Sequence, residues 1–266
     1  MNDRYRGVSV WRLFGRWQPP RRVRWHGVLH HPSHMYHGPS SNVLSKNAFS
    51  QMRAPADASP PAIKAIFFDF DGVLTMDKTG SLTTTRYISQ ATGIDHTRVK
   101  AAFARYNEDL TRGKCTHVEI WDDLCRDMGA DIDIAMLERA FSTTALNDEM
   151  LTLAKRLRPS FIVGLITDNK QDRMDCLERL HGLSAVFRPI VVSAAVGSTK
   201  TDHAIFDHAL RLVDVEPRDC IFIDNNARNL VAPREMGIDA IYFGDEERDV
   251  PALIRELRRR RVVLAM

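Results

Sequence analysis

The chain has 266 residues, of which 44% are hydrophobic, and its formal net charge is +3. This length accommodates one substantial core and a smaller accessory domain, as expected of a globular α/β enzyme. The longest apolar runs have the length of a strand, well short of the roughly 18–20 residues of a membrane helix, which excludes a transmembrane segment. The four cysteines form no C-x-x-C pair, which argues against a redox motif or a structural zinc site and indicates reduced thiols in a cytoplasmic protein.

Residues 1–61 differ in composition from the rest of the chain. They hold nine Lys and Arg and two Asp and Glu, a charge of +7, so the remaining residues carry −4. The basic charge belongs to this segment, and we expect no nucleic-acid binding by the folded part. Clustered prolines and histidines without periodicity predict a disordered basic extension rather than a histidine metal site. An organellar transit peptide and a translation start at Met52 are alternatives that stay open.

From residue 62 onward, short β-branched or aromatic runs alternate with stretches of helical period, which predicts βαβ units and a parallel sheet. The predicted strands comprise residues 63–68, 161–166, 190–192, 220–223 and 240–243. Helices are predicted at residues 148–158, with Asn147 as N-cap, and at residues 170–181, closed by Gly182. Strand patterns are missing from residue 75 to about residue 147, where helical periods predict an insert of about 70 residues.

Polar residues follow four of the predicted strands. Asp69 and Asp71 stand two residues apart at the end of the first strand, where alternation aims both side chains to the same side and invites a hard cation. The alternative to a cation site is an ordinary solvent-exposed turn at the strand end, in which Asp-Gly is a common turn sequence. Thr167, Ser193 and Asp224 follow three other strands. Because ligands bind beyond the carboxyl ends of parallel strands, these positions predict a single crevice.

These segments resemble, in order, the four motifs of the haloacid dehalogenase (HAD) superfamily. The matching segments are Asp69-Phe70-Asp71-Gly72-Val73-Leu74-Thr75, Ile166-Thr167-Asp168-Asn169, Gly197-Ser198-Thr199-Lys200-Thr201-Asp202 and Ile223-Asp224-Asn225-Asn226. The resemblance spans residues 62 to about 250 and implies a doubly wound, mainly parallel, Rossmann-like α/β sheet. It also implies a helical cap domain at residues 77–147, inserted into a core of residues 62–76 and 148–266.

The resemblance further implies a role for each motif residue. Asp69 would be both the nucleophile and a ligand of Mg²⁺, forming an aspartyl-phosphate. The side chain of Asp71 would protonate the leaving alkoxide and later activate water, and its backbone carbonyl would bind the metal. Thr167 would hydrogen-bond the transferring phosphoryl group and Lys200 would offset its charge. Asp224 would complete the metal site together with Asn225.

Each of these residues also has a plainer interpretation. Thr167 could cap the following helix, Lys200 could be a surface lysine, and Asp224 could be an ordinary strand-end turn residue. Three positions depart from the pattern of the relatives. Asn225 replaces a second aspartate, which predicts weaker metal binding; Asp168 stands where asparagine is common, and Thr201 where proline often follows the lysine.

Asp71 bears on the reaction type. A halide leaves unprotonated, whereas an alkoxide needs a proton, so an acid at this position favours phosphoryl transfer over carbon–halogen cleavage. Within the superfamily, the chain most resembles the subgroup of bacterial glucose-1-phosphate phosphatases and the phosphatase-like domain of epoxide hydrolases. The segments that carry this resemblance are the fourth motif, Gly237 and Arg112-Gly113-Lys114. This subgroup implies a cap that selects the substrate. Arg112, Lys114 and His117 would lie near a cap loop, either meeting a polar substrate or at a solvated helix end.

The sequence therefore predicts magnesium-dependent hydrolysis of a small phosphorylated metabolite, for example a sugar phosphate, without a nucleic-acid or membrane partner. A phosphomutase of the same fold is one alternative. A catalytically weakened relative that acts as a binding or regulatory module is the other, and Asn225 motivates it.

Overall fold

The computed structural model describes residues 62–265, which contain a five-stranded parallel sheet. The strands are β1 (Ala65–Phe68), β2 (Ile162–Thr167), β3 (Ile190–Val192), β4 (Cys220–Asp224) and β5 (Asp239–Tyr242). Their order in the sheet is β3-β2-β1-β4-β5, and every neighbouring pair is parallel. The doubly wound α/β fold is confirmed, with β1, the first of the described strands, at the centre. The predictions for residues 1–61 lie outside the described residues.

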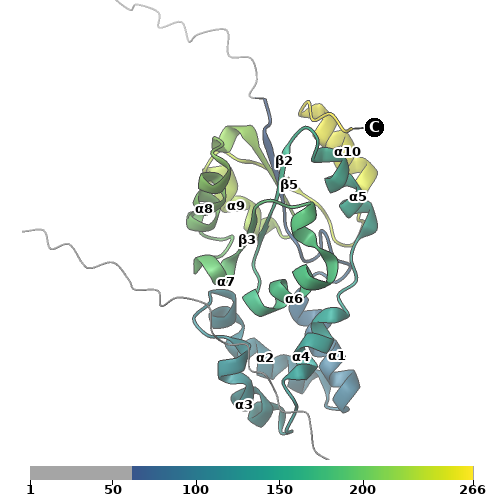
Figure 1. Ribbon diagram of the computed structural model, residues 1–266, viewed down its shortest axis with the longest axis vertical. Coiled ribbons are helices and arrows are strands. Elements are labelled where there is room, and N and C mark those ends of the chain that lie inside the picture. Colours follow the sequence, from purple (N-terminus) through teal and green to yellow (C-terminus); the bar gives the residue numbers. More distant parts are fainter. Residues whose placement is uncertain (1–61, 266) are drawn as a thin grey trace, which may run out of the picture. The chain divides into compact units, whose positions relative to one another are not determined.

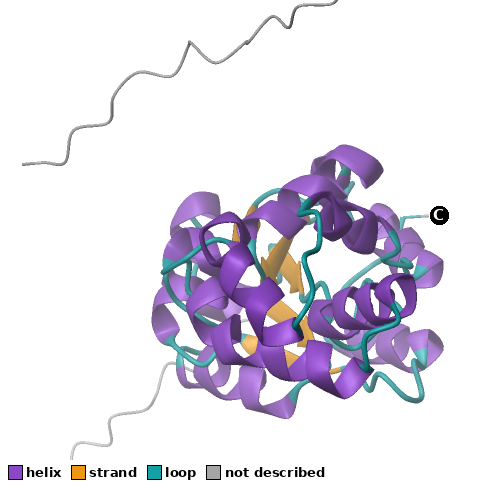
Figure 2. Ribbon diagram, turned by 90° about the horizontal axis from the view of Figure 1, so that it is seen from below, coloured by secondary structure: helices purple, strands orange, loops and turns teal. Residues whose placement is uncertain are grey.

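Helices bury both faces of the sheet. Ile66 and Phe68 of β1 belong to one buried cluster, which includes residues of α5 (Asp148–Leu157), α6 (Gln171–His181) and α10 (Val250–Arg259). Ala65 and Phe67 belong to another cluster, with residues of α8 (His203–Val213) and α9 (Val231–Glu235). Figure 1 shows α5 and α10 on one side of the strands and α8 and α9 on the other, and Figure 2 shows the strands surrounded by helices. Burial of both faces explains why the strands are almost continuously apolar.

Five helices lie between β1 and β2, and the first four of them form an insert that precedes α5. These four are α1 (Gly80–Thr92), α2 (His96–Thr111), α3 (His117–Met128) and α4 (Ala135–Ser142), and we call residues 80–142 the helical insert. The insert has its own buried cluster, which includes Ile88, Phe103 and Leu124. It follows the first strand, as expected; its predicted limits at residues 77 and 147 stay a prediction. Thr75 and Leu146 form an antiparallel bridge at its base, so the two chain segments that flank the insert lie side by side.

The ends of the elements agree with the local sequence signals. The side chain of Asn147 accepts a hydrogen bond from Met150 N and caps α5, and Gly182 ends α6 in the left-handed region with a φ of 59°. β2 and β4 each run one residue beyond the predicted ends, so Thr167 and Asp224 belong to the strands themselves. Short helices complete the described part: α7 (Ser193–Val196) and the 3₁₀ turns Leu183–Ala185, Pro217–Asp219 and Ala227–Leu230. Among residues 62–265, no helix is long and apolar enough to cross a membrane.

Candidate active site

Adjacent strand ends place the motif residues side by side. β1 pairs with both β2 and β4, so Phe68 lies opposite Leu165 and Ile223. The backbone N–H of Asp69 then donates to the carbonyl of Ile223 at 2.8 Å. Thr167 ends β2 and Asp224 ends β4, and all three polar side chains are buried at the carboxyl edge of the sheet. Strand pairing thus brings together residues that lie far apart in the sequence.

Lys200 lies between the two buried carboxylates of this edge. Its Nζ is 2.6 Å from Asp69 Oδ1 and 2.7 Å from Asp224 Oδ2. The lysine is only 2% exposed, and its ammonium lies over the ring of Phe222. Lys200 is therefore no surface lysine. A buried lysine of this kind requires anionic partners, and Asp69 and Asp224 provide them.

The electrostatic balance of these three side chains is negative. Burial raises the pKa of Asp69 well above its ordinary value, and Asp224 adds to that effect, whereas Lys200 works in the opposite direction. Burial alone would lower the pKa of Lys200, but Asp69 and Asp224 raise it above its ordinary value. Two carboxylates therefore share one cation in a site of low dielectric constant. A second positive charge at this place would be stabilised.

Asp224 is fixed by the segment that follows β4. Its Oδ1 accepts from Asn226 N at 2.7 Å, and Asn229 Nδ2 donates to both of its oxygens, at 3.2 and 3.1 Å. Asn225 is partly exposed and packs against Gly72, where an added Cβ would lie 2.1 Å from Asn225 Nδ2. Gly72 has a φ of +82°. A glycine is thus needed at this turn both for the backbone and for the close approach of Asn225.

The donors at this edge suit a hard cation such as Mg²⁺. Asp69 and Asp224 offer carboxylate oxygens, and Asn225 and the backbone of Asp71 offer carbonyl oxygens, the ligand type that Mg²⁺ prefers. Residues 62–265 contain no cluster of three His, Cys, Asp or Glu side chains arranged to hold a metal. This set has only two side-chain carboxylates to contribute, because Asn225 replaces an acid and Asp71 would use its backbone. The excess negative charge around Asp69 is the feature that fits a cation.

The side chain of Asp71 is held by an arginine. Arg173 Nη1 donates to Asp71 Oδ2 and Arg173 Nη2 donates to Asp71 Oδ1, both at 2.9 Å. Asn169 Nδ2 donates to Asp71 Oδ2, also at 2.9 Å. Arg173 is 1% exposed and lies over the ring of Phe70. Asp71 is thus no solvated turn residue, and its bidentate partner on α6 is a residue that the motif comparison did not identify.

Thr167 and Asp168 of the second motif have different surroundings. Thr167 is buried at the end of β2 and does not cap α6, whose N-cap residue is Lys170. Asn169 Nδ2 donates a hydrogen bond to Thr167 Oγ1 at 3.4 Å. Asp168 Oδ1 accepts from the backbone N–H of Lys200 at 2.9 Å, and burial raises the pKa of Asp168. Asp168 therefore fixes the backbone that carries Lys200.

Ser193 connects the sheet to the helical insert. Its Oγ accepts from Asn169 N at 2.9 Å and donates to the carbonyl of Thr111 at 2.7 Å. Beside it, Gly113 packs on Ala194 so closely that an added Cβ would lie 2.0 Å from Ala194 O. The fourth polar strand-end residue thus holds the loop after α2 against the core.

The basic residues around that loop take three different positions. Arg112 pairs with Asp202 at 2.9 Å, and Lys114 is an exposed residue paired with Asp109. His117 is 3% exposed, and its Nδ1 lies 2.7 Å from Asp172 Oδ2 on α6. A solvated helix end, one of the two interpretations from the sequence, is therefore wrong for His117, because α3 begins against the core.

A cleft of about 1230 Å³ separates the strand ends from the helical insert. Asp69, Asp71, Lys200 and Asn225 line it from the core, and residues such as Phe103, Asn107 and His117 line it from the insert. Lys170 also lines the cleft. Its Nζ donates to Asn107 Oδ1 at 2.7 Å, and burial lowers its pKa to about 8. Asp69, Asp71, Lys200 and Asn225 thus face a cavity closed on one side by the insert, whereas Thr167 and Asp224 are buried and do not line it.

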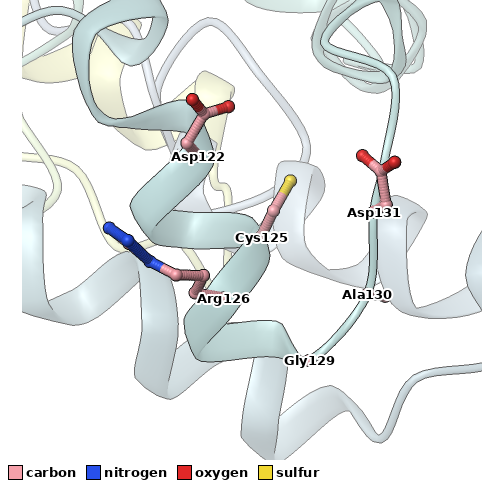
Figure 3. Close-up of a pocket in the computed structure, with 6 residues that line it drawn as sticks. All are labelled: Asp122, Cys125, Arg126, Gly129, Ala130 and Asp131. Carbon is pink, nitrogen blue, oxygen red and sulfur yellow. The ribbon is translucent and has the colours of Figure 1, made fainter.

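A smaller cavity of about 460 Å³ lies elsewhere, at the end of α3. Figure 3 shows its lining residues Asp122, Cys125, Arg126, Gly129, Ala130 and Asp131. It shares no residue with the cleft and contains none of the motif residues. The cleft at the strand ends is therefore the candidate active site.

The sequence and fold also match known proteins. The family model described as haloacid dehalogenase-like hydrolase matches residues 63–237. The chain is 26% identical over 220 residues to bifunctional epoxide hydrolase 2 of Rattus norvegicus, which covers 74% of this chain and 39% of that protein. It is 25% identical over 145 residues to sesquiterpene phosphatase astK of Aspergillus oryzae, covering 52% of this chain and 72% of that protein. The chain thus spans about two fifths of the epoxide hydrolases that it matches.

Solved structures share the fold at low sequence identity. A HAD family enzyme of Bacteroides thetaiotaomicron, solved as a variant in complex with magnesium and inorganic phosphate, has a TM-score of 0.61 at 20% identity and covers 73% of this chain and 100% of that chain. An L-2-haloacid dehalogenase has a TM-score of 0.54 at 16% identity, covering 69% of this chain and 86% of that chain. One fold therefore accommodates a dehalogenase and an enzyme solved with magnesium and inorganic phosphate, so the reaction must be argued from the site itself.

Proposed function

Because the chain belongs to the haloacid dehalogenase-like hydrolases, we propose that it hydrolyses a small phosphomonoester with Mg²⁺ through an aspartyl-phosphate on Asp69. The observation that carries this proposal is the buried group of Asp69, Lys200 and Asp224 at the carboxyl edge of the sheet. Asp69 Oδ1 accepts from both Phe70 N, at 2.7 Å, and Lys200 Nζ. These bonds fix the carboxylate, and among the described residues no hydrogen bond occupies Oδ2. Oδ2 is then the nucleophilic atom.

Asp69, Asp224, Asn225 and the backbone carbonyl of Asp71 would hold the metal. When bound, Mg²⁺ offsets the repulsion between the attacking carboxylate and the two negative charges of a phosphomonoester. Lys200 contributes a second, permanent positive charge at Asp69. Thr167, buried at the end of the neighbouring strand, would donate its hydroxyl to a phosphoryl oxygen.

The first step transfers the phosphoryl group to Asp69. Asp69 Oδ2 attacks phosphorus, the bond from phosphorus to the leaving oxygen breaks, and Asp71 gives its proton to the leaving alkoxide. In the second step, water attacks the aspartyl-phosphate, Asp71 takes the proton of that water, and Asp69 leaves as a carboxylate. The proton balance closes because the same carboxyl group donates and then recovers one proton.

Phosphoryl transfer is favoured over dehalogenation by Asp71. The structure encloses this carboxyl group next to Asp69 in the same cleft, where an alkoxide would need a proton and a halide would not. The name of the fungal phosphatase relative and the phosphate-bound structure of the bacterial enzyme support the same choice. The helical insert would act as a cap over the cleft and select the leaving group, for example a sugar.

The proposal is tested by phosphate release from sugar phosphates, nucleotides and an aryl phosphate, with and without Mg²⁺, using the full chain. We expect release that depends on Mg²⁺ and that Asp69→Asn lowers by more than about 10⁴-fold, because the nucleophile is removed with little change of volume. Asp175→Asn is the matched control, since this exposed aspartate lies on α6 outside the cleft.

Three outcomes would contradict the proposal. The first is an Asp69→Asn variant that keeps its turnover, because Asp69 would then not be the nucleophile. The second is halide release from 2-haloacids in place of phosphate release, which would identify a dehalogenase. The third is activation by a sugar bisphosphate without net phosphate release, which would identify a phosphomutase.

A further inference from the structure

We propose that Arg173 is a positioning residue, which holds Asp71 so that Asp71 Oδ1 serves as the proton acceptor in hydrolysis of the aspartyl-phosphate. This inference rests on the proposed function. It begins with the bidentate pair between Arg173 and Asp71, in which both distances are 2.9 Å and both side chains are buried. Such a pair fixes the plane of the carboxylate as well as its position.

The lone pairs of Asp71 show which oxygen stays available. Oδ2 accepts from Arg173 Nη1 and from Asn169 Nδ2, so both of its acceptor positions are used. Oδ1 accepts from Arg173 Nη2. Thr75 Oγ1 lies 3.5 Å from Oδ1, but its single hydroxyl proton goes to Asp77 O at 2.8 Å. One acceptor position on Oδ1 is therefore free to take a proton.

Arg173 also contacts the chain at both ends of the helical insert. Gly80 begins α1, and a Cβ added there would lie 2.3 Å from Arg173 Cζ and 2.4 Å from Arg173 Nη1. Thr144 follows α4, and its Oγ1 accepts from Arg173 Nη2 at 3.3 Å. The guanidinium is thus confined by the two ends of the insert, by Phe70 beneath it and by Asp71. Its position, and through it that of Asp71, depends on how the insert is seated.

The two chemical steps differ in their need for Asp71. With an aryl phosphate the leaving phenolate is stable without a proton, so attack by Asp69 proceeds without an acid. Hydrolysis of the aspartyl-phosphate still requires removal of a proton from water. Loss of Arg173 should therefore slow the second step selectively, a signature that a purely structural residue would not produce.

The test is rapid-mixing kinetics with 4-nitrophenyl phosphate and Mg²⁺. For Arg173→Met we expect a burst of about one nitrophenolate per active site, followed by turnover about 10- to 100-fold slower than in the wild type, as a misplaced catalytic group produces. Arg173→Lys should show the same burst, since an ammonium cannot bond both carboxylate oxygens in one plane. Arg179→Met, an exposed arginine on the same helix, is the matched control and should behave as the wild type.

A double-mutant cycle connects the effect to Asp71. In the Asp71→Asn background, removal of Arg173 should change the steady-state rate by less than about threefold, because the two residues act as one unit. Gly80→Ala gives an independent variant that displaces the guanidinium while keeping both charges, and it carries the test if Arg173→Met does not fold. We expect the same burst from it.

The outcomes separate this inference from the proposed function. The positioning role would be overturned if Arg173→Lys or Arg173→Met turned over as fast as the wild type. It would also be overturned if Arg173→Met lowered the steady-state rate by the same factor in the wild-type and the Asp71→Asn backgrounds. Either result would leave the phosphatase proposal standing. If the wild type hydrolysed no phosphomonoester in the presence of Mg²⁺, both the positioning role and the phosphatase proposal would be overturned.

Discussion

Replacement of Lys200 by methionine tests the charge balance of the candidate site. Met matches the length of lysine but leaves Asp69 and Asp224 buried without their shared cation. Removal of one partner from a buried ion pair costs about 3–5 kcal/mol of the free energy of unfolding. For a folded unit of this size, about 2–4 °C are lost per kcal/mol, which gives a Tm lower by about 6–20 °C.

The deficit of Lys200→Met should depend on pH in a defined direction. Burial and Asp224 already raise the folded-state pKa of Asp69 above its unfolded value, which is about 3.9, and loss of Lys200 raises it further. A carboxyl group with a raised folded-state pKa binds more protons in the folded state, so its stability contribution is present at low pH and is lost as pH rises through that pKa. The deficit should be small near pH 4 and largest at about pH 8.

Urea unfolding of Lys200→Met and wild type between about pH 4 and pH 8 measures this difference. Lys155→Met is the matched control, because this lysine is exposed on α5. Mg²⁺ should reduce the difference in stability, because the two uncompensated carboxylates of the variant should bind the cation more tightly than those of the wild type, and tighter binding stabilises the folded state more. A deficit below about 1 kcal/mol at neutral pH would show that the two carboxylates do not depend on Lys200, and would refute the argument.

Three further predictions concern the cleft, the helical insert and the sheet. Lys170→Met should be more stable than the wild type at neutral pH, because burial lowers the pKa of Lys170 to about 8. Since the lysine of the unfolded chain stays protonated up to about pH 10, the difference in the free energy of unfolding should disappear as the pH rises from about 8 to 10. Urea unfolding measures this difference. Arg112→Ala removes a partly exposed ion pair with Asp202, so it should lower the free energy of unfolding by no more than about 1 kcal/mol. Limited proteolysis of the insert should become faster. Gly164→Ala should destabilise by about 1–3 kcal/mol in thermal melts, because its Cβ would lie 2.9 Å from the ring of Phe67 and from Pro189 O.

The strands and the motif residues could be predicted because their signals are local. Apolar runs followed by Asp69, Thr167 or Asp224 identify strand ends directly, and the order of a parallel sheet then brings them together. Asn147 and Gly182 act as caps through bonds to near neighbours in the chain. Such features depend on a few consecutive residues, so a single sequence contains them in full.

The partners of the motif residues depend on tertiary packing and were not found. Arg173 and Asp71 are 102 positions apart, so only tertiary packing brings the two side chains together. One signal was present: Arg173 stands beside Met174 and four residues before Leu177, on the face of the predicted helix that the apolar residues define. A charged residue on a buried helix face needs a buried partner. Asn229 and Asp168 gave no such signal, because polar residues are usual in turns.

The central position of β1 has a consequence for synthesis of the chain on the ribosome. Among the described strands β1 emerges first, yet its two neighbours β2 and β4 begin about 95 and about 150 residues later. At about 5–20 residues per second, β1 waits about 5–20 s for β2 and about 8–30 s for β4. The helical insert can form during the first interval, while the apolar strand that carries Asp69 remains without either partner. The nascent chain should therefore bind chaperones through β1 until the C-terminal half has been made.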